Sequence, residues 1–342
     1  MGKHNPVRGF QVDRASLGFV GSDLQRPECI LAERDGSLWA ADARGGVVHL
    51  MPDGRQRIIS QHEQTAFAAA GSETERYTVG TLPNGLAFAR NGDLVIANFG
   101  TDRLELMTRD GRTRVLHDTI DGQAIGKTNF VLRDSKDRLW LTVSTRIRNW
   151  MDAFSPDIAD GYIALVDEHG IRIVADGFAF TNEIRFDAAE EWLYVVETTG
   201  QRVSRLRVQP DGSLTEREIF GPRKLGASGF PDGIAFDAFG NLWGTLIMSD
   251  ILFVLTPEGD YLEVLVDGDP ATSATLEAAF HAGQVSPDTL LATGGQLANW
   301  FASVTFGGQD LQTCYIGSLR GTRIPFFRAP VAGLPMVHWH DR

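Results

Sequence analysis

Six polar residues recur at one position of a repeated sequence phrase, and each carries a side-chain oxygen. Each stands second in a segment that runs into a short apolar strand, and the six are Glu28, Asn84, Asn129, Asn182, Asp232 and Ser303. Two carboxylates with amide and hydroxyl oxygens, and with neither sulfur nor imidazole among them, favour a hard divalent cation. A single Asn or Asp before a strand usually serves a turn, so a metal site is predicted only if the fold gathers several of these residues.

The segments around these residues repeat with the spacing of propeller blades. In four units a large residue of the next strand follows the polar residue after eleven positions, as Trp39 follows Glu28. Most units then contain a glycine turn such as Asp53-Gly54, and Asp-Gly suits the left-handed dihedrals of a tight hairpin. The six polar residues are 56, 45, 53, 50 and 71 positions apart, which indicates six blades of four antiparallel strands.

We therefore expect an all-β fold in which residues 1–342 form a single six-bladed β-propeller domain. The blades should start near residues 28, 84, 129, 182, 232 and 303. Short runs rich in Val, Ile, Phe and Trp, without a sustained helical period, argue against an α-solenoid. The sixth unit lacks a clear outer strand after residues 324–328, so the segment 10–20 is expected to supply an N-terminal strand that closes the ring.

The propeller topology would also place a long loop over the six polar residues. The innermost strand of each blade runs along the central axis, so the polar residues should meet at one mouth of the channel. The loop at residues 144–160 is longer than its equivalents in other blades and would cover this mouth as a lid. Arg146 could bind a substrate carboxylate there, and Trp150 and Phe154 could line the pocket. Alternatively, the arginine could simply be exposed to solvent, and the aromatic residues could serve only to anchor the loop.

Composition excludes several classes of partner. The formal net charge is -12 and no basic stripe is present, so the electrostatic field would repel nucleic acid. No segment approaches the roughly 20 apolar residues that span a bilayer, and the chain is expected to be cytoplasmic without a membrane partner. Cys29 and Cys314 are too few for a disulfide framework and are interpreted as buried apolar residues. Phosphate-binding loops, serine-hydrolase elbows and zincin motifs are missing from the sequence.

Three longer phrases resemble a known family, and the resemblance covers Pro27 to Pro335. They are FTNEIRFDAAEEWLYVVET, FPDGIAFDAFGNLW and ASVTFGGQDLQTCYIGS. The chain is similar to the senescence-marker-protein/gluconolactonase/luciferin-regenerating-enzyme-like proteins, which are six-bladed propellers with one catalytic divalent metal ion. The resemblance implies that the metal ligands are Glu28, Asn129, Asn182 and Asp232. Asn84 and Ser303, which match no ligand of that family, are then candidates for substrate binding, together with Arg146 and Trp150 of the loop.

The activity implied by the resemblance is hydrolysis of a carboxylic ester bond in a small lactone, such as a sugar-acid lactone or a related cyclic ester. The cation, Ca²⁺ by first expectation and Zn²⁺, Mn²⁺, Mg²⁺ or Fe²⁺ as alternatives, would polarise the carbonyl group and activate a water molecule. Asp232 is the expected catalytic base. Phosphotriester hydrolysis, a non-hydrolytic reaction at the same site and a non-catalytic propeller stabilised by metal stay open as alternatives. The sequence also leaves the oligomeric state open.

Overall fold

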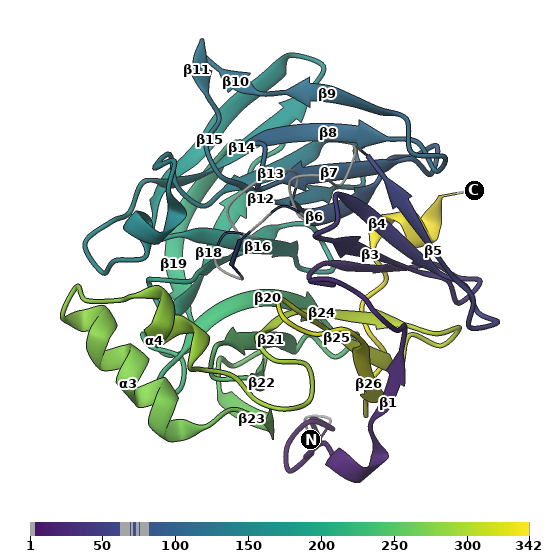
Figure 1. Cartoon of the computed structure of the whole chain (residues 1–342). Helices are drawn as coiled ribbons and strands as arrows, with labels where there is room; N and C mark the ends of the chain where they lie inside the picture. Colours follow the sequence, from purple (N-terminus) through teal and green to yellow (C-terminus); the bar gives the residue numbers. More distant parts are fainter. Residues whose placement is uncertain (1–3, 62–68, 70, 73–74, 76–81, 342) are drawn as a thin grey trace.

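Six four-stranded antiparallel sheets form a ring around a central axis (Figure 1). The computed structural model describes residues 4–61, 69, 71–72, 75 and 82–341. The expectation of an all-β, six-bladed β-propeller is confirmed. A short hairpin of β10 (Thr119–Ile120) and β11 (Gln123–Ala124) lies outside the six sheets, between the second and third blades.

In the first five blades the strands follow chain order from the axis outward. The first blade contains β2 (Ile30–Ala32), β3 (Leu38–Asp42), β4 (Gly46–Leu50) and β5 (Gln56–Ser60), and the second β6 (Pro83–Phe88), β7 (Leu94–Asn98), β8 (Arg103–Met107) and β9 (Thr113–His117). The third contains β12 (Thr128–Arg133), β13 (Leu139–Val143), β14 (Gly161–Asp167) and β15 (Gly170–Phe178). The fourth contains β16 (Thr181–Phe186), β17 (Trp192–Glu197), β18 (Arg202–Val208) and β19 (Leu214–Phe220), and the fifth β20 (Phe230–Phe236), β21 (Leu242–Ile247), β22 (Ile251–Leu255) and β23 (Tyr261–Val266).

The sixth blade combines both ends of the chain and closes the ring. It consists of β24 (Phe301–Gly307), β25 (Thr313–Ser318), β26 (Ile324–Arg328) and the N-terminal strand β1 (Gly18–Val20). Strand β1 pairs antiparallel with β26 as its outer strand, with Val20 opposite Ile324. Closure by an N-terminal strand is therefore confirmed, although only three residues of the segment 10–20 are in that strand.

The recurring tryptophans explain the regular spacing of the repeat. The indole Nε1 of Trp140 donates to Asp134 Oδ2 at 2.9 Å, and Trp243 Nε1 donates to Asp237 Oδ2 at 2.9 Å. In both blades the carboxylate belongs to the turn between the first two strands and lies six residues before the tryptophan. Both rings are fully buried, so each indole fills the core while its one polar atom is satisfied.

Two helices lie between the fifth and sixth blades. Helix α3 (Pro270–His281) and helix α4 (Pro287–Leu291) account for the long last interval of the repeat. They lie on the left in Figure 1, on the same side as the loop between β13 and β14. Phe154 of that loop packs against Phe280 of α3, with ring centroids 5.4 Å apart. The helices therefore support one face of the ring. Among the described helices, none is long and apolar enough to cross a membrane.

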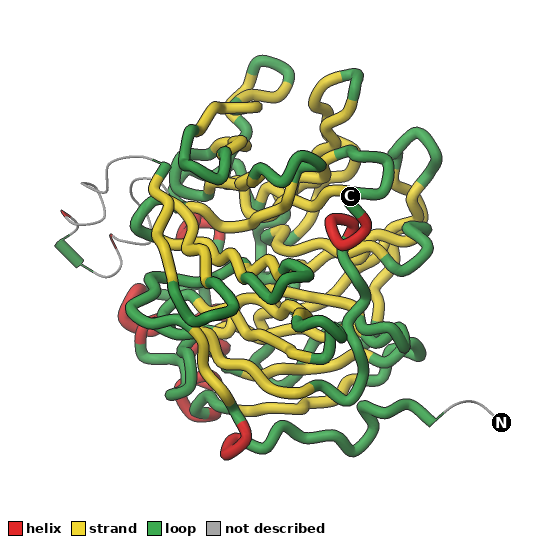
Figure 2. Tube along the Cα trace, turned by 90° about the vertical axis from the view of Figure 1, so that its right-hand side faces the viewer, coloured by secondary structure: helices red, strands yellow, loops and turns green. Residues whose placement is uncertain are grey.

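The C-terminal segment crosses the other face of the ring (Figure 2). The backbone N–H of Leu334 donates to Phe236 O of the fifth blade at 2.8 Å, and the His338 ring nitrogen Nε2 bonds Ala32 O of the first blade at 2.8 Å. Asp341 pairs with Arg133 of the third blade. The segment thus connects blades that are far apart in the sequence.

Candidate functional site

The six recurring polar residues occupy equivalent places in the six blades. Glu28 lies two residues before β2, and the other five lie within the first strands β6, β12, β16, β20 and β24. All six are buried, with exposed fractions of 6% or less. Five of them line one pocket at the mouth of the channel, and these are Glu28, Asn84, Asn129, Asn182 and Asp232.

A break in strand pairing accompanies these residues in five of the blades. The register between the first and second strands shifts between Thr128 and Val131, and equivalent shifts occur in blades two, four, five and six. Each shift falls around the polar residue of its blade. A bulge of this kind leaves residues out of the ladder and changes the direction of a side chain. The irregularities therefore let the polar side chains depart from the ordinary alternation of a strand.

The pocket holds buried oxygen atoms that lack hydrogen-bond partners. Asn129 Oδ1 and Asn182 Oδ1 are both buried and unpartnered in the described structure. The Asn182 amide nitrogen donates to Thr198 Oγ1 at 3.1 Å, which fixes the orientation of the amide. Buried acceptors without a donor are rare in native proteins and call for a missing partner. A bound cation would be such a partner for the two amide oxygens.

The charges in the channel do not balance. Glu28 Oε2 pairs with Arg26 Nη2 at 2.7 Å, and Glu183 Oε2 pairs with Arg185 Nη2 at 3.0 Å. Asp232 has no arginine or lysine partner among the described residues, although it is only 3% exposed. The charge of Arg26 lowers the pKa of Asp232 less than burial and the two acidic neighbours raise it, so one buried negative charge lacks an ion-pair partner, which is unfavourable unless a cation is bound.

The three buried carboxyl groups of the channel all have raised pKa values. Burial raises the pKa of Asp232 well above its ordinary value, and the negative charges of Glu28 and Glu183 raise this pKa further. Burial also raises the pKa of Glu28, against the opposing effect of Arg26. Burial raises the pKa of Glu183 to about 7, against the opposing charge of Arg185. A divalent cation would favour the ionised carboxylates, so the donor set of two carboxylates and two free amide oxygens fits such an ion.

Arg26 is a pocket residue that the sequence interpretation missed. Its Nη2 contacts both Glu28 Oε2, at 2.7 Å, and Asn84 Oδ1, at 2.6 Å. Asn84 in turn donates through Nδ2 to Asn129 O at 3.0 Å. The guanidinium therefore links the first three blades beside the candidate ligands. An arginine two residues before Glu28 gives no signal of burial, because most arginines are exposed.

Thr198 was missed for a similar reason. Its hydroxyl accepts from Asn182 Nδ2 and donates to Pro231 O at 2.8 Å. The residue comes at the end of the second strand of its blade, outside the recurring phrase that identified the other polar residues. Only the ring arrangement places it beside Asn182.

Trp150 lies in the wall of the same pocket, whereas Arg146 and Ser303 do not line it. The Arg146 guanidinium stacks over the Tyr162 ring at 4.6 Å, and the residue is exposed. The Ser303 hydroxyl donates to the backbone carbonyl of Glu28, so it supports the main chain of the first blade. Substrate binding by Arg146 and Ser303 stays a prediction.

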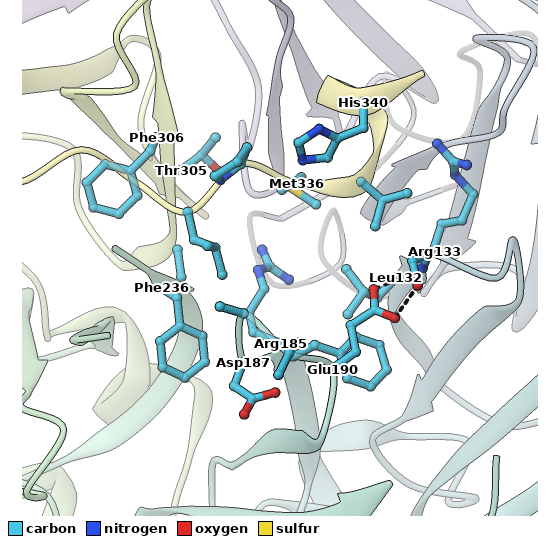
Figure 3. A pocket seen from close by; sticks show the side chains of 18 of the residues that line it. Leu132, Arg133, Arg185, Asp187, Glu190, Phe236, Thr305, Phe306, Met336 and His340 are labelled. Atoms are coloured by element: carbon cyan, nitrogen blue, oxygen red, sulfur yellow. Dashed lines mark hydrogen bonds between the residues drawn. The ribbon is translucent and has the colours of Figure 1, made fainter. Parts of the chain in front are cut away.

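A second pocket lies at the opposite end of the channel, where the first strands end (Figure 3). Arg185 projects into it from β16, and Met336 and His340 of the C-terminal segment face it from the other side. Its lining shares no residue with the first pocket. None of the six recurring polar residues lines this second pocket.

Comparisons with known proteins agree with this architecture. A family model described as the SMP-30/Gluconolactonase/LRE-like region matches residues 26–280. A 6-deoxy-6-sulfogluconolactonase from Pseudomonas putida is 27% identical over 164 residues, which make up 48% of this chain and 46% of that protein. The aligned part thus spans about half the length of this curated relative.

Two solved structures share the fold. A gluconolactonase from Xanthomonas campestris superposes with a TM-score of 0.64 at 18% identity, over 93% of this chain and 89% of that chain. A calcium-binding regucalcin from Agrobacterium tumefaciens superposes with a TM-score of 0.64 at 17% identity, over 93% of this chain and 96% of that chain. At such identities the similarity supports the fold alone.

The family match covers most of the chain and includes Glu28, Asn129, Asn182 and Asp232. The family expected from the repeated phrases is thereby confirmed. This chain belongs to the SMP-30/gluconolactonase/LRE-like family.

Proposed function

We propose that this protein is a metal-dependent hydrolase that opens a lactone of a sugar acid or a related cyclic ester. The observation that carries the proposal is the uncompensated charge of Asp232 beside the two unpartnered amide oxygens of Asn129 and Asn182. The family membership and the relatives named as lactonases support the choice of reaction.

The residues that would hold the cation are Glu28, Asn129, Asn182 and Asp232. Ca²⁺ is the first expectation because all donors are oxygen atoms, and Mn²⁺, Mg²⁺, Zn²⁺ and Fe²⁺ are alternatives. When bound, a divalent cation supplies Lewis-acid polarisation of an ester carbonyl and lowers the pKa of water. Two contacts would preorganise these ligands, since Thr198 accepts a hydrogen bond from the amide of Asn182 and Arg26 pairs with the carboxylate of Glu28.

The protein's own groups would then act as follows. Asp232 accepts a proton from the attacking water at a carboxylate oxygen, as the general base. Asn84, held by Arg26 and by Asn129 O, orders the polar side of the pocket. The apolar wall opposite, which includes Trp150, excludes bulk water from the reacting ester.

Activity measurements with defined metals test the proposal. The purified protein is treated with a chelator, reloaded with one metal at a time, and assayed for proton release from sugar and aliphatic lactones. Asp232→Asn and Glu28→Gln should lower kcat/KM at least 100-fold while the circular dichroism spectrum stays native. Glu168→Gln is the matched control, because the Glu168 carboxylate has an exposed fraction of 87% and lies on a distant turn.

Full lactonase activity in either site variant would refute the assignment of these residues. A melting temperature that depends on metal, in a protein that hydrolyses none of the lactones, would favour the non-catalytic propeller instead. Metal content measured by mass spectrometry of the purified protein identifies the ion.

A further inference from the structure

The pocket at the candidate metal centre has a polar side and an apolar side that do not intermix. Its polar residues all surround the candidate ligands. The rest of the described lining is apolar and comes from six different places in the fold: Phe99, Trp150, Phe154, Phe180, Ile247, Met248, Trp300 and Leu319. A substrate whose ester group lies at the polar side must place its remaining atoms against this wall.

The polar groups of the pocket are already committed to each other. Both ends of the Asn84 amide are used, one by Arg26 and one by Asn129 O. The Thr198 hydroxyl is used by Asn182 and by Pro231 O. In the described lining, the buried polar atoms without a hydrogen-bond or ion-pair partner are Asn129 Oδ1, Asn182 Oδ1, Arg26 Nε and Trp150 Nε1. Outside the candidate ligands, the described residues of the pocket thus offer donors for a carbonyl or ring oxygen but no free buried acceptor for a hydroxyl group.

The apolar wall is held rigidly by a second layer of aromatic residues. Phe154 packs between Phe180, at a centroid distance of 6.4 Å, and Phe230, at 5.0 Å. Phe230 in turn contacts Phe280 of helix α3 at 5.0 Å. Phe154, Phe230 and Phe280 belong to one buried hydrophobic cluster, which also contains Trp300 and Met248. The helical insertion therefore supports the wall from behind.

Three bulky wall residues adopt a backbone conformation that such residues rarely take. The φ angles are 57° at Phe180, 71° at Met248 and 65° at Trp300. A left-handed conformation is unfavourable for a large side chain, and strain of this kind concentrates at functional sites. Here it is found where side chains from three different connections meet in one pocket wall. The fold thus maintains the apolar surface despite local strain.

We infer that the preferred substrate is a lactone whose non-reacting part is an alkyl or aryl group, rather than a polyhydroxylated one. The inference rests on the proposed function and narrows its substrate class. An apolar group gains from leaving water for this wall, whereas each hydroxyl of a sugar lactone would lose its hydrogen bonds with water without finding an acceptor. The ester of either substrate can reach the same polar side, so the wall alone decides between them.

Six-membered lactones that share the reacting ring test the inference. δ-Valerolactone carries no substituent, δ-decalactone adds a five-carbon chain, and glucono-1,5-lactone adds hydroxyl groups. Each fully buried methylene contributes roughly a fourfold factor. If about three to four of the five chain carbons are buried against the wall, kcat/KM for δ-decalactone should exceed that for δ-valerolactone by about 100-fold. Glucono-1,5-lactone should be the poorest of the three.

A wall variant tests whether this pocket is the origin of the preference. Phe180 has a positive φ, which asparagine tolerates well. Phe180→Asn therefore removes the aromatic ring without adding backbone strain. It should reduce the ratio of the kcat/KM values for δ-decalactone and δ-valerolactone about 10-fold. The matched control is Phe239→Asn, in the β20–β21 turn at the far end of the fifth blade, which should leave the ratio as in the wild type.

A binding measurement separates this inference from the proposed function. The lactam analogues of the two aliphatic lactones resist hydrolysis, and their binding is followed by tryptophan fluorescence. Tighter binding of the pentyl lactam by 10-fold or more supports the apolar class even if no lactone is hydrolysed, in which case only the proposed reaction fails. Equal binding of both lactams, or a higher kcat/KM for glucono-1,5-lactone than for δ-decalactone, would overturn the inference while leaving lactone hydrolysis intact.

Discussion

Replacing Asp232 by Asn should make the metal-free protein more stable and inactive at the same time. Three carboxylates lie buried in the channel, and two of them have an arginine partner, namely Glu28 with Arg26 and Glu183 with Arg185. Asp232 has no arginine or lysine partner among the described residues. Burial has the largest effect in raising its pKa, and the charges of Glu28 and Glu183 raise this pKa further. An amide of the same shape removes this unpaired charge and keeps an oxygen in place.

The expected gain can be bounded. Removing an unfavourable group from a functional site commonly stabilises a protein by about 0.5–2 kcal/mol, and an unpaired buried charge belongs at the upper end. With an unfolding entropy of about 2.1 cal/mol/K per residue, a gain of 2 kcal/mol in this chain corresponds to a rise of about 3 °C in Tm. The assay is thermal unfolding at pH 8 in excess chelator. Added metal should then raise the Tm of the wild type more than that of the variant.

The matched control is Asp237→Asn in the same blade. Asp237 is also a buried carboxylate, but it accepts from Trp243 Nε1 at 2.9 Å and from Asn241 Nδ2 at 2.8 Å. The same substitution should therefore lower the stability there. If Asp232→Asn melts below the wild type in chelator, or if both variants shift Tm equally, the charge argument for the cation site is wrong.

Three further predictions concern other parts of the structure. Thr198→Val removes the hydroxyl that orients Asn182 and should weaken metal binding about 10-fold by isothermal titration calorimetry, and an unchanged affinity would show that the hydroxyl does not position the ligand. Cys29 and Cys314 are buried and burial raises the pKa of both thiols, so neither should react with a thiol reagent until the protein unfolds, and fast labelling of the native protein would contradict this. Trp339→Ala should lower the free energy of unfolding by about 3–5 kcal/mol in urea titrations, because its buried ring secures the C-terminal segment, and a loss below 1 kcal/mol would mean that the segment is dispensable.

The repeated phrase predicted the blades and the position of the candidate ligands for one physical reason. A propeller repeats the same unit around an axis, so residues at equivalent places in the sequence become neighbours in space. Glu28, Asn129, Asn182 and Asp232 could be identified as a group on this basis before any geometry was known. The N-terminal closing strand followed from a missing outer strand after residues 324–328.

Features that do not repeat were beyond the reach of the same reasoning. Arg26 reaches the pocket through a positive φ of 58°, an ion pair with Glu28 and two hydrogen bonds to the second blade, none of which has a sequence signature. The apolar wall is assembled from connections that differ in every blade, such as those that carry Phe180 and Trp300. Arg146 was selected from the topology of its loop and Ser303 from its place in the repeat, and both fix the position of a backbone but not the direction of a side chain.

The closure of the ring by β1 and β26 has a consequence for synthesis of the protein. Strand β1 leaves the ribosome about 300 residues before its partner β26. At 5–20 residues per second this interval lasts about 15–60 s. Until then the first blade has no sixth blade to pack against, and its apolar face is open to chaperones or to other nascent chains. Substitutions in β1 should therefore affect the yield of folded protein in cells more than they affect the activity of the molecules that complete the ring.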